Sequence, residues 1–152
     1  MFRVRFWAGA VLASALVAAG CSKSPPGIVP VEGVVLINGK PLPNAEVQFV
    51  PMIQGFGAEY IATGTTDDNG RFKMTCNGQD GACACENKVT VTDVPTPEKL
   101  RGQSAEAQAA VAKFKAGLKN RPIPEVYWNL AQSPLSVTVT ADRKDYELQL
   151  KR

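Results

Sequence analysis

Residues 31–51 read VEGVVLINGKPLPNAEVQFVP, and this segment indicates the fold class. Two runs rich in β-branched residues flank the dipeptide Asn38-Gly39, which is a strong signal for a tight turn between antiparallel strands. The prolines of the segment fall outside both runs, as expected, because proline cannot donate a hydrogen bond within a sheet. The segment therefore predicts strands over 31–37 and 45–50.

Similar alternating segments recur along the rest of the chain, separated by turns rich in Gly, Pro, Asn and Asp. They predict five further strands, over residues 60–65, 71–75, 87–94, 135–140 and 145–150. Seven short strands with frequent turns favour an all-β sandwich, in which two sheets pack face to face. Residues 31–152 are enough for one such domain with its own core.

One segment, residues 98–119, departs from the strand pattern. Ser104 is a suitable helix N-cap, and Gly117 lies near the expected C-terminal end. Four apolar residues after Ser104 recur at helical spacing: Ala107, Val111, Phe114 and Leu118. We expect a short helical insertion that packs over a sheet edge or over the open end of the sandwich. The alternative is a partner-binding helix that leaves Phe114 and Leu118 exposed.

The first 20 residues have the pattern of a secretory signal peptide. Arg3 and Arg5 form a positive amino-terminal region, and an apolar run follows from residue 7 to 17. This run is too short for a membrane-spanning helix, which needs about 20 apolar residues. Cleavage after Gly20 would make Cys21 the first residue of the mature protein.

Residues 18–21, Ala-Ala-Gly-Cys, resemble the lipobox of bacterial lipoproteins, although Ala18 stands where that family prefers leucine. The resemblance implies that the Cys21 thiol receives a diacylglycerol and that the freed amine is acylated as well. Two or three acyl chains, at about 0.8 kcal/mol per buried CH2, make membrane anchoring stable. The non-acidic Ser22 is compatible, by the same resemblance, with export to the outer membrane. Cleavage beside a chance cysteine is the alternative.

Residues 21–30 are polar and contain prolines, so we expect a short tether between the acylated cysteine and the domain. The order of the segments that follow resembles planctomycete-type lipoproteins with a carboxypeptidase-regulatory-like domain. The resemblance rests on the motifs NGKPL at 38–42, TDDNGRF at 66–72 and SPLSVTV at 133–139. It implies a seven-stranded, Greek-key, transthyretin-like β-sandwich without catalytic activity. This chain departs from the family at 81–87, where GACACEN replaces a Gly-Ala-Pro-x-Gly-x-Tyr pattern.

Three further cysteines, Cys76, Cys83 and Cys85, lie close together in the sequence. Export would place them in an oxidising compartment, where such clusters usually form disulfides. Strand alternation lets Cys76 meet either of the other two, so we expect one disulfide from Cys76 to Cys83 or Cys85. The odd thiol would be free or would link two chains. A thiol-redox or metal-handling protein that uses these three cysteines is the alternative function.

The chain contains no histidine, which excludes Ser-His and Cys-His nucleophiles and an imidazole base. A zinc site on the cysteines would also lack its usual histidine ligand. Removal of Arg3 and Arg5 lowers the net charge of +3 by two units, and the sequence has no basic cluster with interleaved aromatic residues. We therefore expect no enzymatic activity, no cofactor, no metal and no nucleic-acid partner.

Tyr127 and Trp128 are adjacent aromatic residues just before a predicted strand. They could stack on sugar rings, which predicts a carbohydrate-binding or small-ligand-binding protein as another alternative. One ring in the core and one over a loop is the structural interpretation of the same pair. The sequence as a whole predicts a non-catalytic, lipid-anchored β-sandwich lipoprotein of the bacterial cell envelope. Its expected partners are the membrane, through Cys21, and an unidentified envelope protein or glycan.

Overall fold

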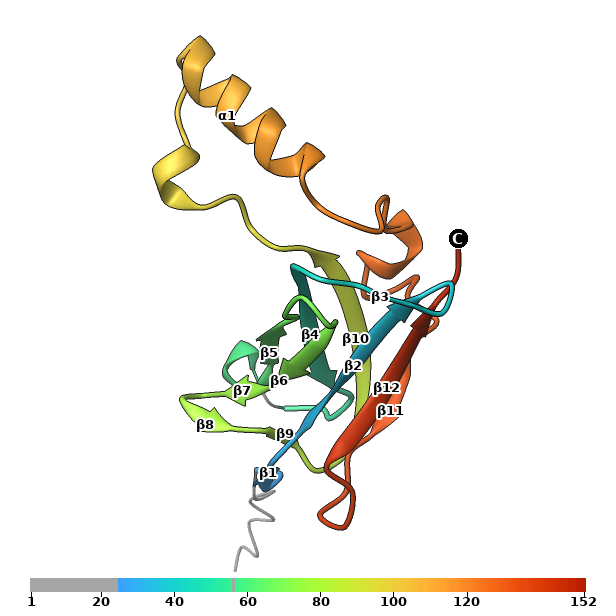
Figure 1. The fold of residues 1–152 in the computed structure, drawn as a ribbon. Helices are drawn as coiled ribbons and strands as arrows, with labels where there is room; N and C mark the ends of the chain where they lie inside the picture. Colours follow the sequence, from blue (N-terminus) through green and yellow to red (C-terminus); the bar gives the residue numbers. More distant parts are fainter. Residues whose placement is uncertain (1–24, 56) are drawn as a thin grey trace, which may run out of the picture.

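The computed structural model describes residues 25–55 and 57–152 (Figure 1). The predictions for the signal peptide and for Cys21 fall outside these residues. Strands are the main regular structure of the described chain, which has mostly antiparallel strand pairs and one α-helix. The expectation of an all-β domain with a helical insertion is confirmed at this level.

The larger sheet has the strand order β11-β10-β4-β5-β7-β8, and all neighbours in it are antiparallel. Its long central pair is β4 with β10, in which Val47 lies opposite Val91. The strands are β4 (Ala45–Pro51), β5 (Ala62–Thr65), β7 (Thr75–Cys76), β8 (Gln79–Asp80), β10 (Glu86–Asp93) and β11 (Ser136–Thr138).

The smaller sheet is built around β2 (Glu32–Ile37). Strand β12 (Asp145–Leu150) pairs with the whole of β2 in parallel. Strands β6 (Arg71–Lys73) and β3 (Lys40–Pro41) are antiparallel to β2, and they pair with its first and second halves. A separate two-stranded ladder joins β1 (Ile28–Val29) to β9 (Ala82–Cys83).

Six of the seven predicted strands are present, with ends within two residues of those expected. The segment predicted as one strand over 71–75 is divided, which corrects that prediction. Residues 71–73 pair with β2 in the smaller sheet, whereas Thr75 pairs with Thr63 of β5 in the larger one. The buried Met74 lies at the crossing, where its amide donates to the Val31 carbonyl at 3.0 Å.

The hydrophobic core follows the period-two alternation of the strands. Ala45, Val47 and Phe49 on β4 are fully buried, and the residues between them are half-buried. Phe49 of the larger sheet packs edge to face on Phe72 of the smaller sheet, with ring centroids 6.1 Å apart. The two sheets therefore pack on each other across a shared apolar interior.

The α-helix α1 (Ala105–Ala116) begins where the sequence predicts. The Ser104 hydroxyl accepts a hydrogen bond from the Ala107 amide at 3.2 Å, and Gly117 follows the last turn. Its position differs from the expectation, because α1 extends away from both sheets and packs mainly on the 3₁₀ helix η2 (Glu98–Leu100) (Figure 1). The predicted apolar residues of this segment, including Phe114 on α1 and Leu118 just after it, are half-buried.

The two ends of the domain carry different elements (Figure 1). We call the end where β1 and β9 lie the tether end, because the described chain begins there. Strand β10 runs from Glu86, near this end, to Asp93 at the opposite end. The segment that contains η2 and α1 leaves β10 there, so we call that opposite end the insertion end.

Candidate functional site

The start of the described chain is held against the sandwich at the tether end. Ile28 pairs with Cys83 in the ladder of β1 and β9, and the Ala84 amide donates to the Gly27 carbonyl at 2.8 Å. Gly81 allows this approach, because a Cβ atom there would lie 1.9 Å from the Val29 carbonyl oxygen. The predicted tether therefore reaches the domain at a fixed point next to β9.

The three cysteines of the described chain lie near this point. Cys76 and Cys83 are fully buried, and their thiols lie within hydrogen-bonding reach of each other. Cys85 is half-buried, and its sulfur lies 3.7 Å from Nδ2 of Asn87. All three are free thiols in this structure. Of the two pairings left open by the sequence, the fold brings together Cys76 and Cys83, and the disulfide itself stays a prediction.

Burial raises the pKa of all three thiols above the ordinary value. The effect is largest for Cys83, whose pKa rises to about 12, first through burial and then through its neighbours Cys76 and Cys85. The thiolate is the nucleophilic form of cysteine, so these groups are unreactive at neutral pH when they are reduced. The arrangement is that of structural cysteines and gives no support to the thiol-redox alternative.

Asn87 holds the backbone around the cysteines. Its side chain is fully buried, and Nδ2 donates to the Cys83 carbonyl at 3.0 Å and to the Cys85 carbonyl at 2.9 Å. Its Oδ1 has no hydrogen-bond partner within the described ranges. The sequence analysis missed this residue, although a polar side chain at an inward-facing position of β10 was the available signal.

A metal site is not formed by these residues. Within residues 25–55 and 57–152, no three Cys, Asp or Glu side chains come together in a way that could hold a metal ion. The metal-handling alternative therefore has no ligand set in the part of the chain that the structure describes.

Tyr127 and Trp128 are separated by the fold. Tyr127, at the end of the 3₁₀ helix η3 (Glu125–Tyr127), is only 5% exposed, and its hydroxyl accepts a hydrogen bond from the Lys151 amide at 2.9 Å. Trp128 is 46% exposed. The two rings therefore do not form a joint stacking surface, and the carbohydrate-binding alternative keeps Trp128 alone.

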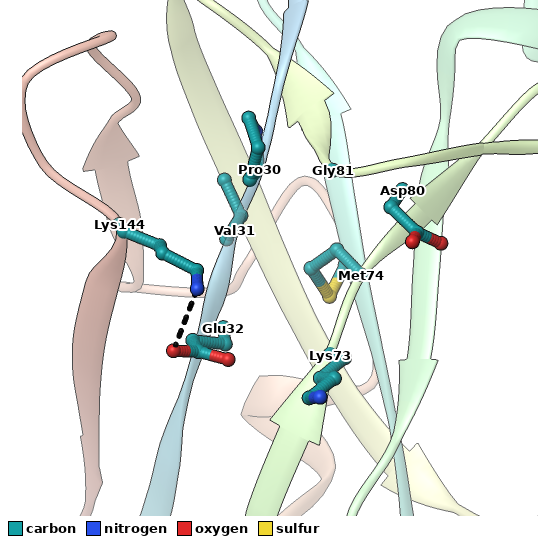
Figure 2. A pocket seen from close by; sticks show the side chains of 8 residues that line it. All are labelled: Pro30, Val31, Glu32, Lys73, Met74, Asp80, Gly81 and Lys144. Atoms are coloured by element: carbon teal, nitrogen blue, oxygen red, sulfur yellow. Dashed lines mark ion pairs between the residues drawn. The ribbon is translucent and has the colours of Figure 1, made fainter.

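A depression of about 180 Å³ lies between β2 and the segment from Lys73 to Gly81 (Figure 2). The carboxylate of Glu32 forms an ion pair with the Lys144 ammonium group at 3.3 Å. Figure 2 shows Lys73 and Asp80 on the other side of Glu32 from Lys144. The charged side chains of the depression are thus two lysines and two carboxylates, of which Glu32 is paired with Lys144. Its lining consists of Pro30, Val31, Glu32, Lys73, Met74, Asp80, Gly81 and Lys144.

A second, more apolar depression of about 470 Å³ lies between Lys88 of β10, Met52 just after β4, and residues 129–131. Met52 and Leu130 line it and are 59% and 40% exposed. Lys88 is part of the same lining, together with Asn129 and Ala131. We call this feature the Met52–Leu130 depression.

Arg121 connects the helical insertion to the sandwich. Its guanidinium forms an ion pair with Asp93 and donates to the carbonyls of Pro43, at 3.0 Å, and Asn44, at 2.7 Å. A third donation goes to the Lys119 carbonyl at 2.8 Å. The side chain is only 13% exposed. Because a guanidinium group has several donors, Arg121 links both ends of the insertion to the loop that contains Pro43 and Asn44.

No family model, curated protein or solved structure matches this chain. The site therefore rests on geometry alone. No helix in the described ranges is long and apolar enough to cross a membrane. The described residues form a fixed tether point with a buried cysteine pair beside it, and an apolar depression beside β10. A helix projects from the insertion end (Figure 1).

Proposed function

We propose that this chain is a non-catalytic lipoprotein of the bacterial cell envelope, anchored by acyl chains on Cys21, which serves as a binding or assembly module. The sequence supports this through its signal pattern and through the resemblance of residues 18–21 to a lipobox. The absence of histidine from the whole chain and the paired state of Glu32 support a role without catalysis.

The observation that carries the proposal is the opposition of the two ends of the domain. The tether joins the sandwich beside β9, whereas α1 projects from the far end (Figure 1). A lipid on Cys21 would hold the tether end at the bilayer. The helix would then be presented away from the membrane, where a partner in the envelope can reach it.

The projecting segment, residues 98–119, which we call the arm, also differs in charge from the rest of the chain. Between residues 94 and 120, five basic side chains stand against two acidic ones, Glu98 and Glu106. The basic residues, all of them exposed or half-exposed, are Lys99, Arg101, Lys113, Lys115 and Lys119. An envelope protein or glycan with an acidic surface is therefore the partner that fits this arm.

The finer fold assignment belongs to the same proposal. A seven-stranded, Greek-key, transthyretin-like topology is supported by the seven longer strands and by their order along the chain. The short strands β1, β3, β7, β8 and β9 would be local additions to that plan. The non-acidic Ser22 supports the outer membrane as the final location, by resemblance to other lipoproteins.

The test compares the wild-type chain with a Cys21→Ser variant after expression in a Gram-negative host. We expect intact-mass measurement to find two or three acyl chains on the wild-type amino terminus and the protein in the membrane fraction. The variant should lack the acyl chains and remain unprocessed. A bare amino terminus on wild-type protein in the aqueous fraction would refute the lipid anchor.

Proximity labelling from the native, membrane-attached protein then tests the partner. Replacement of residues 98–119 by a Gly-Ser linker removes the arm and keeps Arg121. We expect the labelled proteins or glycans to change when the arm is removed, with unchanged acylation. An identical labelling pattern for both chains would exclude the arm as the docking element.

A further inference from the structure

Exposed apolar side chains from distant segments of the chain meet in one depression beside β10. Among the described residues, four large apolar side chains are exposed: Met52, Val126, Trp128 and Leu130. Met52 and Leu130 line one depression, although they lie on segments far apart in the sequence. Trp128 precedes Leu130 by two residues. A cluster of exposed apolar side chains is typical of a surface that contacts a protein, a ligand or a membrane.

The backbone places Met52 close to the point where the tether joins the domain. The Gly27 carbonyl accepts from the Ala84 amide at 2.8 Å, and the Glu86 carbonyl accepts from the Met52 amide at 2.9 Å. The two residue steps from Ala84 to Glu86 span at most about 7 Å, the length of the same steps in extended chain. The Met52 backbone therefore lies within a few residue lengths of Gly27.

The length of the tether limits how far this surface can be from the anchor. Even when fully extended, the chain from Cys21 to Gly27 reaches at most about 20 Å. An acylated Cys21 would therefore keep the tether end, and not the insertion end, beside the bilayer. This step rests on the proposed lipid anchor.

The chemistry of the depression fits a phospholipid interface. Met52 and Leu130 can enter the boundary between headgroups and acyl chains, as the apolar side chains of interfacial proteins do. Lys88 lines the same depression, and a lysine beside apolar surface can bind lipid phosphate with its ammonium group. A weak contact is sufficient here, because the tether holds the surface at a high effective concentration near the bilayer.

We propose that the Met52–Leu130 depression, with Lys88 in its lining, docks on the phospholipid surface of the membrane that carries the lipid anchor. The anchor and the depression would then form two contacts with one bilayer. Two contacts restrict the rotation of the domain, so that α1 points away from the membrane.

Trp128 is a built-in reporter for this contact. The chain has two tryptophans, and Trp7 lies in the signal peptide, so Trp128 is the only tryptophan of the processed protein. The processed, acylated full chain is reconstituted into vesicles of phosphatidylethanolamine and phosphatidylglycerol, with ordinary or brominated acyl chains. We expect brominated lipid to lower Trp128 emission about twofold, because the bilayer contacts the neighbouring surface.

Three variants test which residues make the contact. Met52→Asp combined with Leu130→Asp should abolish the quenching while acylation and vesicle binding persist. Lys88→Gln should reduce the quenching in these vesicles and not in vesicles from which phosphatidylglycerol is omitted. Val126→Asp changes an apolar side chain of similar exposure, 39%, that does not line the depression, and should leave the quenching unchanged.

The outcomes separate this inference from the proposed function. An acylated, vesicle-bound protein whose emission is equal in ordinary and brominated lipid would overturn the docking and leave the anchor standing. Quenching that the double variant does not change would also overturn it. A protein without acyl chains would overturn both. Emission that responds to an added glycan or envelope protein, and not to brominated lipid, would assign the depression to that partner instead.

Discussion

Phe49 and Phe72 meet edge to face across the two sheets, with their ring centroids 6.1 Å apart and their planes inclined by 61°. Phe49 is fully buried and Phe72 is 2% exposed. This contact joins β4 of the larger sheet to β6 of the smaller sheet, close to the point where the chain crosses between the sheets at Met74.

Removal of the Phe72 ring should destabilise the whole domain. We expect Phe72→Ala to lower the free energy of unfolding by about 3–5 kcal/mol, because it leaves a cavity between the sheets. Urea denaturation measures the change. Lys73→Ala, next to it and exposed, is the matched control and should change the free energy by less than about 0.5 kcal/mol. Equal effects for both variants would contradict the sandwich core described above.

Gly33 should not accept a side chain. A Cβ atom there would lie 2.0 Å from the Tyr146 carbonyl oxygen and 2.8 Å from the Phe72 ring, so alanine would force β12 away from β2. We expect Gly33→Ala to lower the free energy of unfolding by more than about 2 kcal/mol. Gly27→Ala is the control, because no atom lies within 4 Å of its added Cβ. A Gly33→Ala protein as stable as this control would argue against the pairing of β2 with β12.

Arg121 should be needed to hold the insertion in place. Arg121→Gln removes the ion pair with Asp93, leaves the Pro43 carbonyl without its guanidinium donor, and leaves the Asn44 carbonyl with only the Val94 amide. We expect a loss of about 1–3 kcal/mol in the free energy of unfolding and faster proteolysis between residues 94 and 120.

Arg71→Gln is the comparison for Arg121. It breaks the ion pair between Arg71 and Asp145, whose side chains are 52% and 65% exposed. An exposed pair of this kind contributes at most about 1 kcal/mol, and its loss should not change the proteolysis of the insertion. If the two variants were cleaved at the same rate, Arg121 would have no special role in fixing the arm.

The cysteine pair should be bonded in exported protein. We expect peptide mapping to link Cys76 to Cys83 and to find Cys85 accessible to alkylation after unfolding. Closure of so short a loop stabilises the fold by about 2–3 kcal/mol, which reduction should remove. A bridge that contains Cys85, or three free thiols in exported protein, would contradict this pairing.

The reduced protein should lose stability at alkaline pH. Burial raises the pKa of Cys83 from 9.0 to about 12 in the folded state, so the protonated thiol favours folding fully below pH 9. That contribution is lost as the pH rises from about 9 towards 12. We expect the melting temperature of the reduced wild type to fall more steeply over this range than that of a Cys76→Ala, Cys83→Ala double variant. Parallel curves would show that the thiols are not buried as described.

The strands were predictable because their signals are local. The Asn38-Gly39 dipeptide forms the expected turn, with both residues at positive φ and Ile37 paired with Lys40. Alternation of buried and exposed positions located the seven longer strands, and Ser104 marked the start of α1. Each of these features depends on residues within one turn or one strand.

The remaining features depend on contacts between distant segments, which a single sequence does not display. The break at Met74 exists because its two sides pair with different sheets. Arg121 acts through the carbonyls of a loop 77 and 78 residues away, and its charge alone suggested no such role. The Met52–Leu130 depression likewise joins two segments that have no common motif.

The parallel pairing of β2 with β12 has a mechanical consequence. The chain enters β2 at the tether end and leaves β12 at the insertion end (Figure 1). A force that pulls the start of β2 and the end of β12 in opposite directions would slide these two strands past each other along their length. Six residue pairs, from Asp145 with Glu32 to Leu150 with Ile37, would then share the load at once. This shear geometry makes the pair of strands resist stretching between those two points.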